Sequence, residues 1–181
     1  MRPWLTWTIG AGALMAAWLV ALATPSQDDV ESPFAVRLEL GQAAAGRNLE
    51  VTVIDVRMAR EVAAGAWSAE GTWLVVDLDA QAVVAEDDAL LTAATLEVGG
   101  TTYRASERPA SLLGAALSVG IPRTGGLAFE LPGDPPTGTA TLSLGLDADT
   151  RLDSLLELPI ALDAVPRVAR ADLVPTGWAA P

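Results

Sequence analysis

The sequence predicts an all-β protein, an antiparallel β-sandwich of seven to eight strands preceded by one apolar N-terminal helix. Short stretches of alternating apolar and polar residues recur at fairly even spacing from residue 34 onward, which is the pattern of half-buried strands. Gly99-Gly100 separates two of these stretches, and such a pair is a strong signal for a two-residue hairpin turn. No helical pattern is long enough to connect parallel strands, so we expect an antiparallel arrangement.

The predicted strands follow one another between residues 34 and 164. They cover 34–40, 49–58, 72–80, 95–98, 101–105, 127–131, 139–146 and 155–162, with a further apolar stretch at 112–117. The alternation slips near Ile54-Asp55, which predicts a β-bulge there. Pro159 has no N–H to donate to a strand ladder, so the last strand is expected at a sheet edge or with a bulge.

The uncharged stretch at residues 4–24 predicts a membrane-spanning helix. At 1.5 Å per residue it is long enough for the hydrocarbon core of about 30 Å. Arg2 precedes it and acidic residues follow it, so we expect a retained single-pass anchor. The N-terminus would be cytoplasmic and the domain extracytoplasmic, held in the lipid bilayer through residues 4–23. Ala21-Leu22-Ala23 fits a cleavage site, so secretion after removal of a signal peptide is the alternative.

Four parts are therefore expected along the chain: an anchor over 1–24, a polar linker over 25–33, a sandwich domain over 34–164 and a Pro-rich tail over 165–181. The tail has more apolar residues than a spacer needs, and it also carries Arg167 and Arg170. Three alternatives stay open for it. It is disordered, it docks on its own sandwich, or it docks on a partner with Trp178 as the anchor.

Composition excludes several kinds of active site. The chain has no His and no Cys, and all 11 of its basic residues are Arg. Ser-His-Asp and Cys-His sites, lysine Schiff bases, disulfides and His- or Cys-based zinc sites are therefore excluded. The net charge of −12 disfavours binding to nucleic acid, because the phosphate backbone is repelled.

Three groups of acidic residues are candidates for a cation site or for acid–base chemistry. They are Asp147, Asp149 and Asp153; Glu86, Asp87 and Asp88; and Asp55, Asp77 and Asp79. The first departs from the EF-hand pattern, and we expect a solvated turn. The second is expected to protect a sheet edge. In the third group, alternation places Asp77 and Asp79 on an outer sheet face, whereas glycoside hydrolysis by paired carboxylates would also need a sugar-binding cleft. We expect no catalytic residue, no cofactor and no metal.

Aromatic and basic residues give two further candidates. Trp67 and Trp73 flank a loop and could form an exposed platform for a glycan or peptide, although we expect Trp73 to cover the sheet and Trp67 to anchor the loop. Arg104 and Arg108 lie near Tyr103 and could contact an anionic polymer. Surface ion pairs are the expected role of these arginines.

Four motifs follow one another in the order seen in a known group of domains: VTVIDVR, WLVVDL, GGTTYRAS and FELP. This order, from Leu49 to Leu162, resembles the telokin-like, immunoglobulin-like domains of bacterial exported proteins. The resemblance implies an immunoglobulin-like sandwich and extracytoplasmic anchoring, and it transfers no site residue. True immunoglobulin domains carry two cysteines that this chain lacks. The Ala-rich, Lys-free composition resembles that of proteins from high-GC Gram-positive bacteria.

We therefore expect a non-catalytic, membrane-anchored extracytoplasmic module with an interaction or structural role, as an accessory subunit of a cell-envelope complex. Its partner would be a membrane or envelope protein. The candidate contact residues are Trp178, Arg167, Arg170, Trp67 and Trp73. The alternative is an extracytoplasmic module that binds a cation or an envelope glycan.

Overall fold

The computed structural model describes residues 3–23, 33–133, 137–147 and 153–179. It divides into two compact units, residues 1–32 and residues 33–181, and each is described by itself. Apart from Pro33, the expected linker over 25–33 lies outside the described residues.

The first unit contains one helix, α1, at Pro3–Ala23. Within the described residues, no helix combines the length and the apolar character needed to cross a membrane. The expected single-pass anchor over residues 4–23 is therefore wrong, and so is the membrane location derived from it. The prediction relied on length and lack of charge. Much of this stretch is alanine, glycine and threonine, which contribute little apolar surface.

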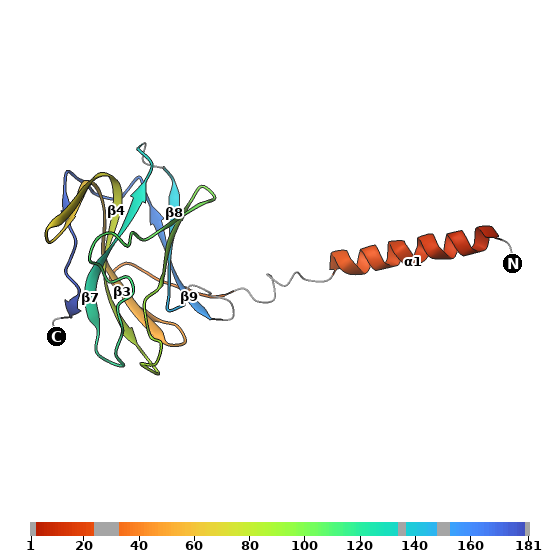
Figure 1. The fold of residues 1–181 in the computed structure, drawn as a ribbon, viewed down its shortest axis with the longest axis horizontal. Coiled ribbons are helices and arrows are strands. Elements are labelled where there is room, and N and C mark those ends of the chain that lie inside the picture. The colour runs from red at the N-terminus through yellow and green to blue at the C-terminus, as the bar shows by residue number, and fades with distance from the viewer. Residues whose placement is uncertain (1–2, 24–32, 134–136, 148–152, 180–181) are drawn as a thin grey trace. The chain divides into compact units, whose positions relative to one another are not determined.

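The second unit is a β-sandwich of two sheets (Figure 1). The first sheet has the order β1 (Phe34–Arg37), β9 (Ser154–Ala161), β8 (Thr139–Gly145), β5 (Ala93–Val98) and β6 (Thr101–Arg104). The second has the order β10 (Arg167–Val168), β3 (Leu49–Ala64), β4 (Trp67–Ala82), β7 (Arg123–Leu131) and β12 (Gly177–Trp178). Two short strands, β2 (Ala43–Ala45) and β11 (Ala171–Asp172), also pair with β3.

The predicted β-sandwich is thus confirmed, and each of the eight predicted strands has a counterpart in the structure. The expectation of a wholly antiparallel arrangement is wrong, because β1 pairs in parallel with β9, and β10 and β11 pair in parallel with β3. The strands β2, β10, β11 and β12 were not predicted, since each is only two or three residues long. Residues 112–117 form no named strand, although Leu112 and Leu117 are buried.

The main core lies between the two sheets and follows the alternation of the sequence. Inward-facing residues of the central strands are fully buried, and each contributes roughly 1.5–3 kcal/mol relative to an exposed side chain. They include Val51, Val53, Leu74, Val76, Leu78, Phe129, Leu96, Leu142, Leu144 and Leu156.

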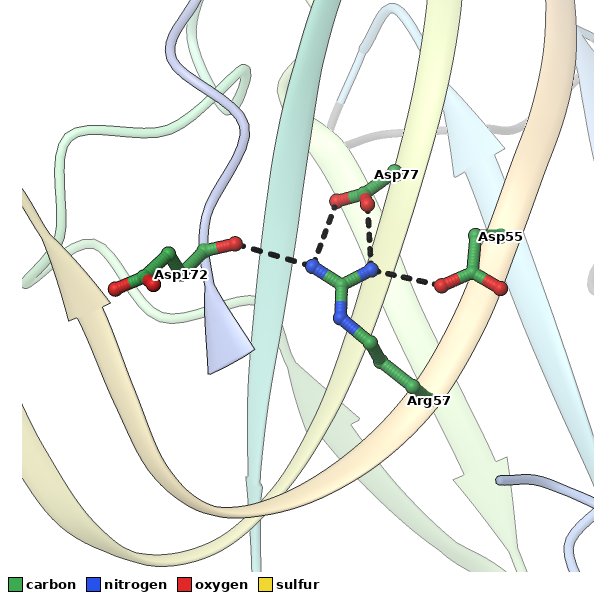
Figure 2. Close-up of polar contacts among 4 residues, drawn as sticks. All are labelled: Asp55, Arg57, Asp77 and Asp172. Atoms are coloured by element: carbon green, nitrogen blue, oxygen red, sulfur yellow. Dashed lines mark hydrogen bonds and ion pairs between the residues drawn. The ribbon is translucent and has the colours of Figure 1, made fainter. Parts of the chain in front are cut away.

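The predicted bulge is present in β3. The pairing of β3 with β4 shifts register between Val53 and Asp55, which leaves Ile54 exposed at the shift. A second shift lies between Ala59 and Glu61. Bulges bend a strand and increase its twist, and β3 and β4 curve together as a pair (Figure 2).

Two local predictions about turns and edges are also confirmed. Gly99 and Gly100 join β5 to β6 with φ angles of 57° and 80°, as a two-residue hairpin turn of this kind requires. Pro159 lies at a partly open edge, because β1 pairs with β9 only from Ser154 to Glu157. Among the described residues, no strand lies beside Pro159 on that side.

Candidate functional site

The C-terminal tail is built into the second sheet. Its β10 runs parallel to β3, with Arg167 opposite Met58 and Val168 opposite Ala59. Further along, β11 is also parallel to β3, and β12 is antiparallel to β7 with Trp178 opposite Arg123. Figure 1 shows the dark blue tail on the side of this sheet that faces away from β8 and β9. Three alternatives were open for the tail, and in the structure it docks on its own sandwich.

Apolar burial explains this docking. Ala171 and Leu173 of the tail are buried in a second, smaller core on the outer face of the sheet. The members of this second core are Ala59, Val62, Trp73, Val75, Ala128, Ala171 and Leu173. Alternation placed Trp73 on the outer face, and it lies there, but it is fully buried because the curved hairpin and the tail cover that face.

A close backbone approach fixes the path of the tail at Gly126. The Gly126 N–H donates to the Val174 carbonyl at 3.1 Å. A Cβ at Gly126 would lie 2.8 Å from Leu173 Cδ2 and 3.3 Å from the Val174 nitrogen. Only glycine therefore lets the tail cross β7 at this distance.

We expect Gly126→Ala to destabilise the domain by about 1–3 kcal/mol, the usual cost of overpacking. The physical reason is that the methyl group must push Leu173 and the tail backbone away from β7. Urea unfolding of the full chain measures this loss. Gly133→Ala is the matched control, since its added Cβ meets nothing within 4 Å, and a change of equal size in both variants would contradict the account.

Arg57 is the centre of a polar cluster under the tail (Figure 2). Its Nη1 donates to Asp55 Oδ2 at 2.8 Å and to Asp77 Oδ2 at 2.5 Å. Its Nη2 donates to Asp77 Oδ1 at 3.4 Å and to the Asp172 carbonyl oxygen at 3.1 Å. One guanidinium therefore links β3, β4 and the tail.

The electrostatics of this cluster explain why an arginine lies here. Asp55 and Asp77 are directly paired across β3 and β4, and like charges in that position destabilise a sheet. Arg57 lies between them with its side chain only 16% exposed. Burial lowers the pKa of Arg57, but the hydrogen bonds and charges of Asp77 and Asp55 more than offset this, so the pKa is raised overall.

Two of the three aspartates that sequence reasoning weighed for acid–base chemistry, Asp55 and Asp77, are thus engaged by Arg57. The third, Asp79, is half-buried in β4. Asp77 lies on the outer face of the sheet, as alternation predicted, but the tail covers that face and leaves the residue 9% exposed. Sequence reasoning missed Arg57 altogether. The sequence places Arg57 two residues after Asp55, on the same face of a strand, and this spacing could have indicated their ion pair. The contact of Arg57 with Asp77 depends on how β3 pairs with β4 after the bulge, which the sequence does not show.

The aromatic platform is not formed as an exposed surface. The Trp67 and Trp73 rings meet edge to face, with centroids 6.1 Å apart and planes at 87°. The Arg108 guanidinium lies 5.2 Å from the centroid of Trp73 and 5.9 Å from that of Trp67, and it forms an ion pair with Glu130. The expected surface ion pair of Arg108 is therefore present, whereas Arg104 forms none with the residues that the structure describes.

The acidic loops do not assemble into a metal site in the part of the chain that the structure describes. Glu86 Oε1 accepts a hydrogen bond from the Val119 N–H at 3.1 Å and so joins two loops. Asp153 Oδ1 lies 4.0 Å from Arg47 Nε. Asp149 lies outside the described residues.

Trp178 is presented at an edge of the second sheet. It lies in β12, with 59% of the residue exposed. The Arg123 guanidinium lies 4.9 Å from its ring centroid, within the range of a cation–π contact. Arg123 is itself held by a hydrogen bond from Nη1 to the Ala116 carbonyl at 2.9 Å. Sequence reasoning found Trp178 but not Arg123, because their pairing depends on where the tail docks.

A groove of about 860 Å³ lies beside the other edge strand, β10. Its charged and polar wall is formed by Arg60 and Glu61 of β3, Glu70 of β4 and Arg167 of β10, with Val168 beside them. Arg170 is close by and pairs with Glu61 at 3.0 Å and with Asp172 at 3.3 Å. The structure therefore brings the predicted residue Arg167 together with Arg60, which sequence reasoning did not single out.

No family model matches the chain, and no curated protein matches it. Among solved structures, the chain is similar to an uncharacterised β-sandwich protein from Clostridium difficile 630. The match has 12% sequence identity and a TM-score of 0.45, and it covers 76% of this chain and 99% of the other.

Proposed function

We propose that this protein is a non-catalytic interaction module that binds a partner protein through the surface around Trp178. The observation that carries the proposal is the position of Trp178, which is ordered in a strand, stacked by Arg123 and still 59% exposed. Tryptophan is the residue type most enriched at the energetic centres of protein interfaces, usually in an apolar pocket of the partner. The partner is therefore a protein that offers an apolar pocket to the indole.

The way the indole is held supports this use. The ring is fixed by strand pairing and by Arg123, so binding costs little side-chain conformational entropy. Ile121, two residues before Arg123, is also 52% exposed and adds apolar area on the same segment. An exposed aromatic side chain with an ordered support is suited to rapid docking without local refolding.

The residue types of the chain support a non-catalytic role. With no His, Cys or Lys, the sequence lacks imidazole, thiol and amine groups, which serve as nucleophiles or general bases in many enzymes. The directly opposed carboxylates of Asp55 and Asp77 share the guanidinium of Arg57. Together with Arg57 these two carboxylates form an ion-pair cluster beneath the tail instead of facing an open cleft.

We also infer that the sandwich is of immunoglobulin-like type. The strand orders β3-β4-β7 in one sheet and β9-β8-β5 in the other support this inference, since they correspond to A-B-E and G-F-C of that fold. The order of motifs that resembles telokin-like domains is a second support. Domains of this type commonly serve in recognition, which agrees with the proposed role.

The test compares Trp178→Ala with the unchanged chain in quantitative affinity capture from the source cells. Loss of an interface anchor costs about 2 kcal/mol or more, so we expect the true partner to bind about 30-fold more weakly. Val84→Ala is the matched control, because Val84 is also strongly exposed but lies in a loop away from β12. If both variants capture the same proteins as the unchanged chain, the proposal is wrong.

A further inference from the structure

We propose that the outer edge of β1 is an interface between two copies of this chain, in which the two β1 strands pair in antiparallel fashion across a two-fold axis. The edge belongs to the first sheet, whereas Trp178 lies in the second. The inference therefore does not depend on the surface around Trp178.

The hydrogen bonds of β1 leave one edge of the strand unpaired. β1 is the outermost strand of the first sheet and runs parallel to its neighbour β9. The N–H groups of Phe34 and Leu38 donate toward β9, both at 2.8 Å. Bonded residues alternate along a paired strand, so Ala35 and Arg37 direct their N–H and C=O groups away from β9. No hydrogen bond to these outward groups comes from the described part of the chain.

β1 also lacks the features by which proteins usually protect an open edge. Residues 34–37 contain no proline, no lysine and no bulge. Phe34 is 60% exposed, and Ala35 beside it is exposed as well. The opposite edge of this sheet is closed, because the chain after β6 bridges to β7 and the Ser106 N–H donates to the Ala128 carbonyl at 2.7 Å. β1 is therefore the edge of the first sheet at which another strand can be added.

A second copy of β1 fits this edge by symmetry. Antiparallel pairing about a two-fold axis at Val36 places Ala35 of each copy opposite Arg37 of the other. Every outward N–H and C=O of the two strands is then satisfied by a main-chain bond. No like charges lie directly opposite each other, an arrangement that would destabilise the pair. Both copies use the same edge, so the interface gives a closed dimer and not a filament.

Apolar contacts add to these main-chain bonds. The two Val36 residues form a pair without mutual hydrogen bonds, the position in which side chains of antiparallel strands come closest. Phe34 lies diagonal to Val36 of the other copy on the same face, so the dimer covers an exposed ring with a favourable aromatic and β-branched contact. The strand has only four residues, so we expect a weak, reversible dimer.

A single introduced thiol reports the register, because the chain has no cysteine. The Cα atoms of the two residues 36 would be about 4.5 Å apart, within the range of a disulfide. Two residues 35 would lie diagonally, about 7–8 Å apart, which is too far without backbone movement. Under copper–phenanthroline oxidation of the full chain, we expect Val36→Cys to form a disulfide dimer at least tenfold faster than Ala35→Cys. Random collision would give the opposite order, since Ala35 is the more exposed.

Thr102→Cys is the matched control on another strand, because Thr102 is exposed in β6. It should cross-link no faster than Ala35→Cys.

Sedimentation equilibrium of the full chain at physiological salt measures the dimer itself. Ala35→Pro should raise the dissociation constant at least tenfold, because proline removes the outward N–H and leaves the bonds to β9 in place. Ala35→Ser keeps this N–H and should change the constant less than twofold. Thermal unfolding of both variants establishes that they are folded.

Several outcomes would overturn the inference. These are a chain that stays monomeric at millimolar concentration, equal cross-linking rates of Val36→Cys and Thr102→Cys, or a dimer that Ala35→Pro leaves unchanged. A dimer that Trp178→Ala abolishes and Ala35→Pro does not would assign self-association to the surface around Trp178. A dimer that neither variant changes would assign it to another part of the chain, such as α1.

Discussion

Removal of the tail after Ala164 is expected to destabilise the sandwich by about 5 kcal/mol, a large part of the 5–15 kcal/mol of an ordinary domain. Truncation removes the buried side chains of Ala171 and Leu173 and opens the second core, which exposes Trp73. It also takes away the carbonyl of Asp172 that accepts from Arg57 at 3.1 Å. Each exposed large side chain alone costs about 1.5–3 kcal/mol.

Urea unfolding of the truncated and full chains measures the loss, and two point variants locate its source. Leu173→Ala should cost about 2–4 kcal/mol, because it empties a buried site. Val168→Ala should cost less than about 0.5 kcal/mol, because that side chain is 37% exposed. A truncated chain that unfolds at the same urea concentration as the full chain would show that the tail contributes nothing to the domain.

Arg57→Met is expected to destabilise the domain by about 3 kcal/mol, as breaking a largely buried ion pair does. The substitution keeps the apolar stem but leaves Asp55 and Asp77 as two opposed carboxylates beneath the tail. Asp77 has a side chain only 13% exposed, so water compensates its charge poorly. Denaturant unfolding at neutral pH measures the effect.

Two companion variants make this result specific. Arg47→Met should change stability by less than about 1 kcal/mol, because its ion pair with Asp153 is long and its side chain is 68% exposed. Arg57→Met combined with Asp77→Leu should recover part of the loss, since no uncompensated charge then remains in the buried position. If the single Arg57 variant is as stable as the Arg47 variant, the cluster has no structural role.

The parts of the fold that follow local rules could be predicted from the sequence. Alternation identified the long strands because one face of each packs on the main core. The slip at Ile54-Asp55 predicted a bulge, and Gly99-Gly100 predicted a turn, because both depend only on neighbouring residues. Pro159 predicted an open edge for the same reason.

The parts that depend on long-range contacts could not be predicted. Alternation assigned Trp73 and Asp77 to the outer face, but nothing local indicates that a curved hairpin and a tail cover that face. The tail strands are too short for any periodicity to be visible. Arg57 meets Asp77 only after the bulge changes the register, and Arg60 meets Arg167 only after β10 has docked.

The site was accordingly only partly visible in the sequence. Trp178 and Arg167 were chosen for residue type, and both lie on surfaces that the docked tail creates. Arg123, which stacks on Trp178, comes from β7, and Arg60, which lines the same groove as Arg167, comes from β3; both are far away in the chain. The membrane anchor was wrong because absence of charge was taken as sufficient, without the apolar content that spanning a membrane requires.

The central claim is that the docked tail completes the domain and thereby places Trp178 and the groove on its surface. Native-state hydrogen exchange of the full chain, measured residue by residue, tests it most directly. The amide of Leu173 donates to the Ala63 carbonyl at 2.8 Å and that of Gly126 to the Val174 carbonyl at 3.1 Å. We predict that both exchange as slowly as the amides of the central strands β4 and β7. Exchange of the Leu173 amide at the rate of an unfolded peptide would contradict the account.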